Sequence, residues 1–333
     1  MKYCPKCGVA YISSSFCANC GEDLSSHGTS AGPVSDVQTA LSPFESFLNA
    51  DGSTYTIMGL KDTSLRELRI PSCVSVIRAS AFSGCDRLLS IFIPDSVTVV
   101  ERNAFLNCSA LSSLILSASM TEINNSVLSG CSSLSSAVVP EGVTRIDESA
   151  FSVCISLESV SIPDTVTEIG DMAFEGCSAL ETIRLPRELT VLGIGAFNGC
   201  SGIRRVTIPA GISIINHEAF SGCSSLETVT LTAPVSTIGN KAFRDCASLR
   251  SIILPEGLQS IGNEAFRGCG SLESLVIPEG VVTLGDGVFA DCASLRSITL
   301  PDSLRAVGTA LFENCPKLTD INASFRVKRM VRQ

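Results

Sequence analysis

The chain has 333 residues, of which 33 are acidic and 24 basic, giving a formal net charge of −9. This balance makes nucleic acid an unlikely partner of the bulk surface, because binding to phosphates depends on clustered Lys and Arg. No stretch of about 18 apolar residues occurs, and no apolar segment follows the basic start, so we expect neither a transmembrane segment nor an export signal. A cytoplasmic location follows as the main expectation, with a surface or extracellular location as the alternative.

Two C-x-x-C-G motifs lie at residues 4–8 and 17–21. Two thiolates on one tight turn can hold one ion, and two such turns complete a tetrahedral shell of four sulfurs. A module of this size has too little core to fold without metal. The pair resembles the short zinc ribbons of many bacterial and archaeal proteins. We therefore predict a structural zinc ribbon over residues 1–24, with iron as the minor alternative metal and four ligands: Cys4, Cys7, Cys17 and Cys20.

The next segment, residues 25–43, is small, polar and without periodicity, which predicts a flexible linker. His27 within it is expected to be solvent-exposed, since four thiolates already complete the metal site. Residues 44–60 carry alternating apolar side chains around Asp51 and Gly52, a pattern typical of a β-hairpin. We expect this hairpin to cap the open end of the segment that follows.

Cysteine recurs every 23 residues through most of the chain, at positions 85, 108, 131, 154, 177, 200, 223, 246, 269, 292 and 315. A period of this length predicts a solenoid, in which each repeat buries its apolar side against its neighbours. Stacked coils place equivalent Cβ atoms about 4.8 Å apart and parallel, whereas a disulfide needs converging Cβ atoms about 3.8 Å apart. We therefore expect these cysteines to be buried thiols with a weak S–H donor.

The copy at residues 157–177 shows the parts of one repeat. Val160 and Ile162 alternate with serine, which predicts a short strand with one buried face, and Pro163 ends its ladder. Ala173 and Phe174 then lie on a tight helical turn. The predicted fold is a repeat solenoid, mainly β with short helical turns, over residues 61–325, plus the zinc ribbon. A basic tail, residues 326–333, is expected to fold back over the last coils or to bind an acidic partner.

This pattern resembles the BspA-like leucine-rich repeat family, whose members carry L-x-x-[VI]-x-[IL]-P-x-x-[VL]-x-x-I-x-x-x-A-F-x-x-C. The resemblance covers nearly everything after residue 60. It implies a curved solenoid with a strand-lined face that recognises proteins, and known members are often surface proteins that attach to host proteins or other cells. The chain departs from the family pattern at its start, and some units diverge, with Ser117 and Thr232 in place of Pro and Leu128 in place of Phe.

Strand residues that face away from the core form one column, which holds all but one of the candidate partner-binding side chains; Arg205 belongs to the column beside it. Three consecutive members are apolar and predict an exposed patch, although β-branched residues also simply suit strands. The candidates are Phe92, Ile115, Val138, Arg184, Arg205, Ile253 and Val276. A neighbouring column alternates in sign and is interpreted as a device that sets the register of the coils; its members are Glu181, Arg204, Glu227, Arg250, Glu273 and Arg296.

These observations favour a non-enzymatic scaffold that binds a protein partner through the repeats, with the zinc ribbon as a second recognition module. His27 and His217 are the only histidines, and neither lies in an acid–base or nucleophile arrangement, so we expect no small-molecule substrate. The alternative is a surface or exported adhesin of the BspA-like type. A nucleic-acid-associated regulator acting through the ribbon is a lesser alternative, because Lys2 and Lys6 are offset by acidic neighbours.

Overall fold

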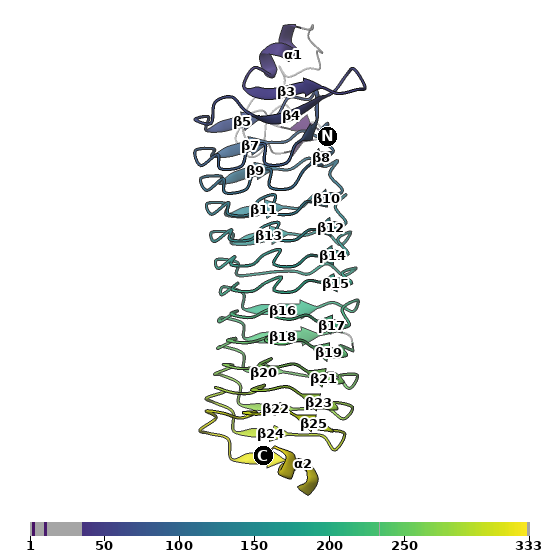
Figure 1. Cartoon of the computed structure of the whole chain (residues 1–333), viewed down its shortest axis with the longest axis vertical. Coiled ribbons are helices and arrows are strands. Elements are labelled where there is room, and N and C mark those ends of the chain that lie inside the picture. The colour runs from purple at the N-terminus through teal and green to yellow at the C-terminus, as the bar shows by residue number, and fades with distance from the viewer. Residues whose placement is uncertain (1, 4–9, 12–34, 233, 332–333) are drawn as a thin grey trace.

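The computed structural model describes residues 2–3, 10–11, 35–232 and 234–331, of which the last two ranges form a long, narrow stack of coils (Figure 1). At the amino terminus, β1 (Lys2–Tyr3) pairs antiparallel with β2 (Ala10–Tyr11). The predicted zinc ligands Cys4, Cys7, Cys17 and Cys20 lie outside the described residues, as does His27. Within the described part of the chain, no helix is long and apolar enough to span a membrane.

Nearly every coil contributes one strand to a first side of the stack, here called face A; among the described residues, the coil of Arg184 contributes only an isolated bridge, between Ser159 and Thr182. The strands of this face pair in parallel at an offset of 23 residues, as in Ser136 with Ser159, and form four short sheets. Face A consists of β5 (Glu67–Arg69), β7 (Ser90–Phe92), β9 (Ser113–Ile115), β11 (Ser136–Val138), β13 (Ser159–Ser161), β16 (Arg205–Ile208), β18 (Thr228–Leu231), β20 (Ser251–Ile252), β22 (Ser274–Val276), β24 (Ser297–Thr299) and β26 (Asp320–Asn322). The predicted 23-residue solenoid is therefore confirmed.

The return limb of each coil forms a second side, face B, whose strands also pair in parallel. They are β6 (Val74–Ile77), β8 (Val99–Val100), β10 (Glu122–Ile123), β12 (Arg145–Ile146), β14 (Glu168–Ile169), β15 (Val191–Leu192), β17 (Ile214–Ile215), β19 (Thr237–Ile238), β21 (Ser260–Ile261), β23 (Thr283–Leu284) and β25 (Ala306–Val307). The third side has no strands and is built from the turn that carries the Ala-Phe pair and the cysteine.

Glycine sets the spacing of the coils on face B. A Cβ added at Gly170, Gly193, Gly239, Gly262, Gly285 or Gly308 would lie within 3.0 Å of the preceding coil's backbone. Asn124 and Asn216 occupy this column instead, and their side-chain amides donate to the carbonyl oxygens of Val100 and Leu192, 2.8 and 2.7 Å away. The strand ladder of face B is interrupted at these two places, between β8 and β10 and between β15 and β17. At these two places a side-chain amide donates the hydrogen bond that a backbone N–H donates in other coils, as from Gly170 to Ile146.

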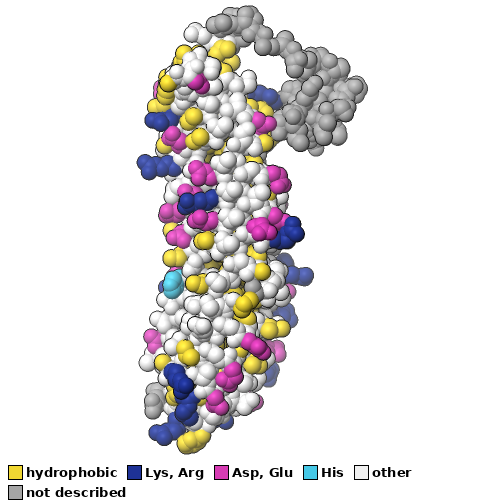
Figure 2. Space-filling view, turned by 90° about the vertical axis from the view of Figure 1, so that its right-hand side faces the viewer, with side chains coloured by type: hydrophobic (Ala, Val, Ile, Leu, Met, Phe, Trp, Pro, Cys, Tyr) yellow, Lys and Arg dark blue, Asp and Glu magenta, His cyan; other side chains and the backbone are white. Residues whose placement is uncertain are grey.

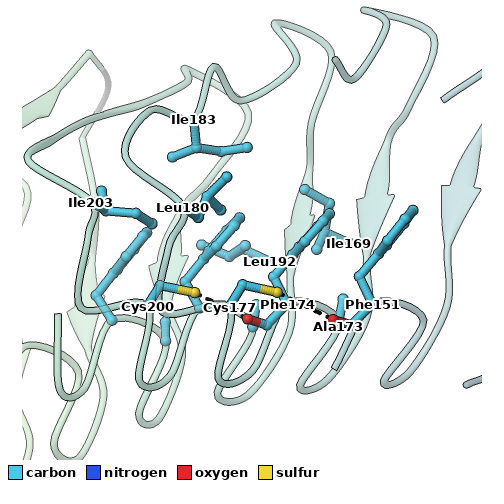
Figure 3. Close-up of a cluster of buried hydrophobic side chains, with 14 of the residues drawn as sticks. Phe151, Ile169, Ala173, Phe174, Cys177, Leu180, Ile183, Leu192, Cys200 and Ile203 are labelled. Atoms are coloured by element: carbon cyan, nitrogen blue, oxygen red, sulfur yellow. Dashed lines mark hydrogen bonds between the residues drawn. The ribbon is translucent and has the colours of Figure 1, made fainter. Parts of the chain in front are cut away.

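The core consists of columns of identical side chains. From Phe151 to Phe312 the rings stack along the axis with centroids 5.1 to 5.8 Å apart, and Figure 3 shows Phe151 and Phe174 beside the thiols. Leu128, the one departure from Phe in this column, is fully buried between Phe105 and Phe151. Ser117 is buried in place of Pro, and its hydroxyl donates to the Val97 carbonyl oxygen at 2.6 Å.

A helix and a hairpin close the amino-terminal end of the stack. Strands β3 (Phe44–Leu48) and β4 (Tyr55–Leu60) are antiparallel, and β4 continues face B by pairing with β6. The predicted flexible linker, residues 25–43, needs correction, because helix α1 (Ser35–Ala40) lies within it. Val37 and Leu41, four residues apart and thus on one helical face, pack against the core.

Helix α2 (Phe325–Met330) closes the other end of the stack (Figure 1). Val327 is fully buried against the last coils. The Arg326 guanidinium donates to the carbonyl oxygens of Leu304, at 2.8 Å, and Asp302. These contacts place the start of the basic tail over the last coils, where it covers apolar side chains that a further repeat would otherwise bury.

Candidate protein-binding face

Face A presents every second strand residue to solvent, because side chains alternate across a strand. In β13, for example, Val160 is buried while Ser159 and Ser161 are exposed. All seven candidate residues lie on the outward side of this face, and six of them occupy one column along the axis, with Arg205 in the column beside it. The structure therefore brings them together on one surface.

Three apolar members of this column are strongly exposed. Val138, Ile253 and Val276 are 69%, 86% and 64% exposed, more than any other large apolar side chain on the described strands or directly after them. Phe92 and Ile115 are direct neighbours in the β7–β9 ladder, but both are half-buried. The Arg69 guanidinium lies 5.2 Å from the Phe92 ring centre and covers it. The exposed part of the predicted apolar patch is therefore mainly Val138.

Two arginines at the middle of face A share one carboxylate. Asp164 accepts from Nη2 of Arg184 at 2.8 Å, from Nε of Arg187 at 2.8 Å and from the backbone N–H of Arg187 at 3.0 Å. The backbone N–H of Arg187 and the two guanidinium groups hold the pKa of Asp164 well below its usual range. The arginine side chains themselves are 63% and 78% exposed. Asp164 thus fixes two guanidinium groups at the surface.

A groove of about 570 Å³ lies beside these arginines, and its lining includes Leu185, Thr207 and Thr232. At the position of Leu185 in five other coils, the backbone N–H donates to a backbone carbonyl oxygen of the next coil, as from Ile277 to Thr299 at 2.9 Å. In the described structure no such bond joins Leu185 to Thr207, and Thr232 replaces proline one coil further on. Within the described residues the same bond is also absent at Leu116, Ile162 and Leu254, so it does not by itself account for the groove. The coil of Arg184 differs from these in contributing none of the described strands of face A.

Arg187 and this groove were not predicted from the sequence. A signal was present, because Arg187 occupies a column that is otherwise acidic at Asp95, Glu141 and Asp164. Acidic members of this column bind the backbone of the next coil, as Asp95 does at the N–H of Ala118, 2.8 Å away. An arginine cannot accept this bond, so its side chain turns to Asp164 instead.

The interpretation of the column of alternating charges, Glu181 to Arg296, as a register device needs correction. Among its six members, the described structure has one ion pair, Arg204 with Glu227 at 4.0 Å. Shorter pairs join coils elsewhere, as between Lys241 and Glu218 at 3.1 Å or Arg267 and Asp291 at 2.9 Å. Opposite charges in successive coils are therefore not enough, because the long side chains take other directions.

The cysteine column contains free thiols that donate to backbone oxygens of the preceding coil. Burial raises the pKa of Cys223 to about 12, which opposes a thiolate at neutral pH. His217 accepts the backbone N–H of Asn240 at Nδ1, 2.8 Å away, in a slot where Asn240 and Asn263 do the same with a side-chain oxygen. Among the described residues, no group of three or more His, Cys, Asp or Glu could hold a metal ion.

Comparison with solved structures shows the same kind of solenoid. A leucine-rich cell surface protein from Faecalibacterium prausnitzii is 27% identical, with 87% of this chain and 96% of that chain covered and a TM-score of 0.56. The pneumococcal vaccine antigen PcpA shares the fold at 18% identity, with 85% and 86% covered and a TM-score of 0.54. A leucine-rich repeat protein from Bacteroides ovatus is 26% identical, with 86% and 94% covered and a TM-score of 0.43.

The repeats also match a family model. A separate comparison with individual curated proteins found no match. The model of the BspA type leucine rich repeat region matches residues 59–181, 144–269 and 213–332, which together cover nearly all of the solenoid. The chain therefore belongs to the BspA-type leucine-rich repeat family.

Proposed function

We propose that this chain is a non-enzymatic cell-surface protein that binds a protein partner through the outer side of face A. The F. prausnitzii structure, 27% identical over most of both chains, is described as a cell surface protein. No comparison supports the cytoplasmic location that we expected from the sequence, so the surface location, our alternative there, becomes the proposal.

The exposure of Val138, Ile253 and Val276 carries the assignment to face A. Exposed apolar side chains in one column are a typical feature of protein-binding surfaces, and covering such a side chain contributes about 1.5 to 3 kcal/mol. Flanking hydroxyl side chains, such as Ser161 and Thr207, provide hydrogen-bonding groups without much bulk.

Face B supports this role less well. Its exposed apolar side chains, Val99, Val191 and Ile214, are each less than half exposed. Figure 2, which looks at this side of the molecule, shows a surface of mostly uncharged polar groups and backbone with scattered apolar and charged side chains. Face B therefore offers a partner less apolar area than face A.

A pair of matched triple variants tests the proposal. Partners are captured from extracellular and cell-surface protein extracts on the immobilised chain, identified by mass spectrometry, and titrated to give a Kd. The variant V138S/I253S/V276S should weaken binding at least about tenfold. The control V99S/V191S/I214S makes the same changes on face B and should leave the Kd within about twofold. Equal Kd values for both variants would rule out face A.

Location is tested separately on intact native cells. A membrane-impermeant biotin reagent labels the lysines of proteins at the outer surface. We expect labelled chain, with a known cytoplasmic protein as the unlabelled control. Recovery of the chain only in the unlabelled cytoplasmic fraction would contradict the surface location.

We also propose that Cys4, Cys7, Cys17 and Cys20 bind one structural zinc ion as a ribbon over residues 1–24. The four-thiolate pattern supports this, as does the antiparallel pair β1–β2 on either side of the first motif. Elemental analysis of the purified chain should give about one zinc per chain, and C17S/C20S should lose it. Iron in place of zinc would identify the minor alternative, and no metal would contradict the ribbon.

A further inference from the structure

We infer that the partner presents an acidic segment with apolar residues on both sides, and that its carboxylates bind at Arg184, Arg187 and Arg205 on face A. This inference rests on the proposed function and names the chemistry of the partner at the same surface. The chain as a whole has a net charge of −9, yet Arg184 and Arg187 share one carboxylate on face A, and Arg205 is exposed on the next coil.

The charges around this site leave it basic on its outer side. Asp164 is shared between Arg184 and Arg187, and Glu188 adjoins Arg187 in sequence. Glu181 and Glu227 belong to the column of Arg204, which pairs with Glu227. Arg205 is exposed and forms no ion pair or side-chain hydrogen bond within the described part of the chain. Three guanidinium groups therefore face solvent against one carboxylate held between two of them.

The arginines retain donors for a partner. A guanidinium carries five N–H groups in a planar fork that suits carboxylates. Asp164 uses only Nη2 of Arg184, so Nε and Nη1 of that side chain stay available. On Arg187 it uses Nε and Nη2, which leaves Nη1. Because Asp164 already orders these side chains, binding loses less side-chain entropy than it would with mobile arginines.

The groove gives the site depth. Leu185, Thr207 and Thr232 line it beside the two arginines, over a volume of about 570 Å³. An apolar floor next to guanidinium groups excludes water from part of the contact and strengthens a carboxylate–arginine interaction. A partner side chain can therefore enter the surface here rather than lie on it.

The apolar side chains define the spacing of the expected segment. Val138 lies two coils before Arg184, and Ile253 lies three coils after it. At about 4.8 Å per coil and about 3.4 Å per residue of extended chain, these separations match about three and about four residues. The expected partner segment thus has its acidic residues between an apolar residue about three positions to one side and another about four positions to the other.

Selection of peptides from a random library tests this chemistry directly. Phage-displayed peptides of about 12 residues are selected on the immobilised full chain, sequenced, and made synthetically for fluorescence anisotropy. We expect enrichment of Asp and Glu with flanking apolar residues, and a Kd that rises with salt. The variant R184Q/R187Q/R205Q should weaken binding of these peptides at least about tenfold. The control R250Q/R296Q/R329Q removes the same charge away from the groove and should change the Kd less than about twofold.

Two further measurements separate lost partner contacts from lost folding of the variants. Arg205→Gln alone breaks no ion pair of the described structure and should still weaken binding, and circular dichroism melting shows whether each variant is folded. Selected peptides without acidic enrichment, or equal effects of the two triple variants, would overturn the inference. Tighter binding of heparin than of the acidic peptides would also overturn it, in favour of a sulfated polysaccharide. If V138S/I253S/V276S still weakens partner binding at least about tenfold in these cases, the proposed function stands without the inference.

Discussion

The thiol of Cys200 donates a hydrogen bond to the backbone carbonyl oxygen of Phe174, with Sγ and O 3.0 Å apart (Figure 3). The same carbonyl accepts the backbone N–H of Cys177 at 3.2 Å. Equivalent thiol bonds, 3.0 to 3.3 Å long, recur for every member of the cysteine column from Cys108 to Cys315. The cysteine column therefore links each coil to the one before it through a side-chain donor.

Cys200→Ala should destabilise the solenoid by about 2 kcal/mol. The change removes a buried hydrogen bond, with a net contribution of about 1 kcal/mol, and leaves a small cavity in a fully packed column. The urea midpoint of unfolding, followed by circular dichroism, measures the loss. Ser224→Ala, at an exposed serine one coil away, is the control and should leave the midpoint unchanged. Equal midpoints for both variants would show that the thiol column does not support stacking.

Alkaline pH should unfold this protein through its thiols. Burial raises the pKa of Cys223 and of Cys292 to about 12, whereas a thiol in the unfolded chain ionises near pH 8.5. Above about pH 8.5 the folded chain binds more protons than the unfolded chain, so the free energy of unfolding falls with pH, by up to about 1.4 kcal/mol per unit for each such thiol. Below that pH the thiol contribution is fully present.

The comparison of urea midpoints at about pH 7 and about pH 10 measures this effect. The double variant C223A/C292A should be less stable than the parent chain at neutral pH but should lose less stability between the two values. If the parent and the variant lose the same amount, the buried thiols are not the source of the pH dependence.

The fold could be predicted from the sequence because its period is strict. Once Cys177 and Cys200 mark the same place in successive coils, the inward positions of Phe174 and Phe197 follow from the same offset. The outward position of Val138, Ile253 and Val276 follows from strand alternation. Helix α1 could not be predicted in this way, because it occurs once and has no repeat to reveal it.

Side-chain contacts between coils could not be predicted from spacing. The 23-residue offset brings Glu181 and Arg204 to neighbouring coils, but it does not set the rotamers of two long side chains, and no ion pair joins them. The groove lies at the coil of Arg184, which contributes none of the described strands of face A, and the repeat pattern of the sequence does not show this. Such features arise from local departures from the repeat, so only the structure reveals them.

Val153→Asn should stabilise the chain by about 1 kcal/mol. The position before each member of the cysteine column has a left-handed backbone in all eleven coils, with φ of 60° at Val153. A β-branched residue pays the highest steric cost there, whereas Asn tolerates this conformation. The other coils have Gly84, Asn107, Gly130, Gly176, Gly199, Gly222, Asp245, Gly268, Asp291 and Asn314 at this place.

The melting temperature measures this gain, and Ile155→Asn is the matched control. Ile155 is as exposed as Val153 and lies two residues away, but its backbone is not left-handed. The control should not raise the melting temperature. A similar rise for both variants would mean that lost surface hydrophobicity, and not relief of backbone strain, stabilises the chain.

Gly262→Ala should destabilise the solenoid by about 1 to 3 kcal/mol, because it overpacks the contact between two coils. The added Cβ would lie 2.6 Å from the backbone nitrogen of Asn240, a distance that requires the coils of face B to move apart. Gly270→Ala is the matched control, since its nearest neighbour, the carbonyl oxygen of Ala247, would be 3.7 Å from the new Cβ. Urea unfolding should show a lower midpoint for the first variant and an unchanged or slightly higher one for the second, because alanine restricts the unfolded chain more than glycine does. If both variants unfold at the same midpoint, the glycine column does not set the spacing between coils.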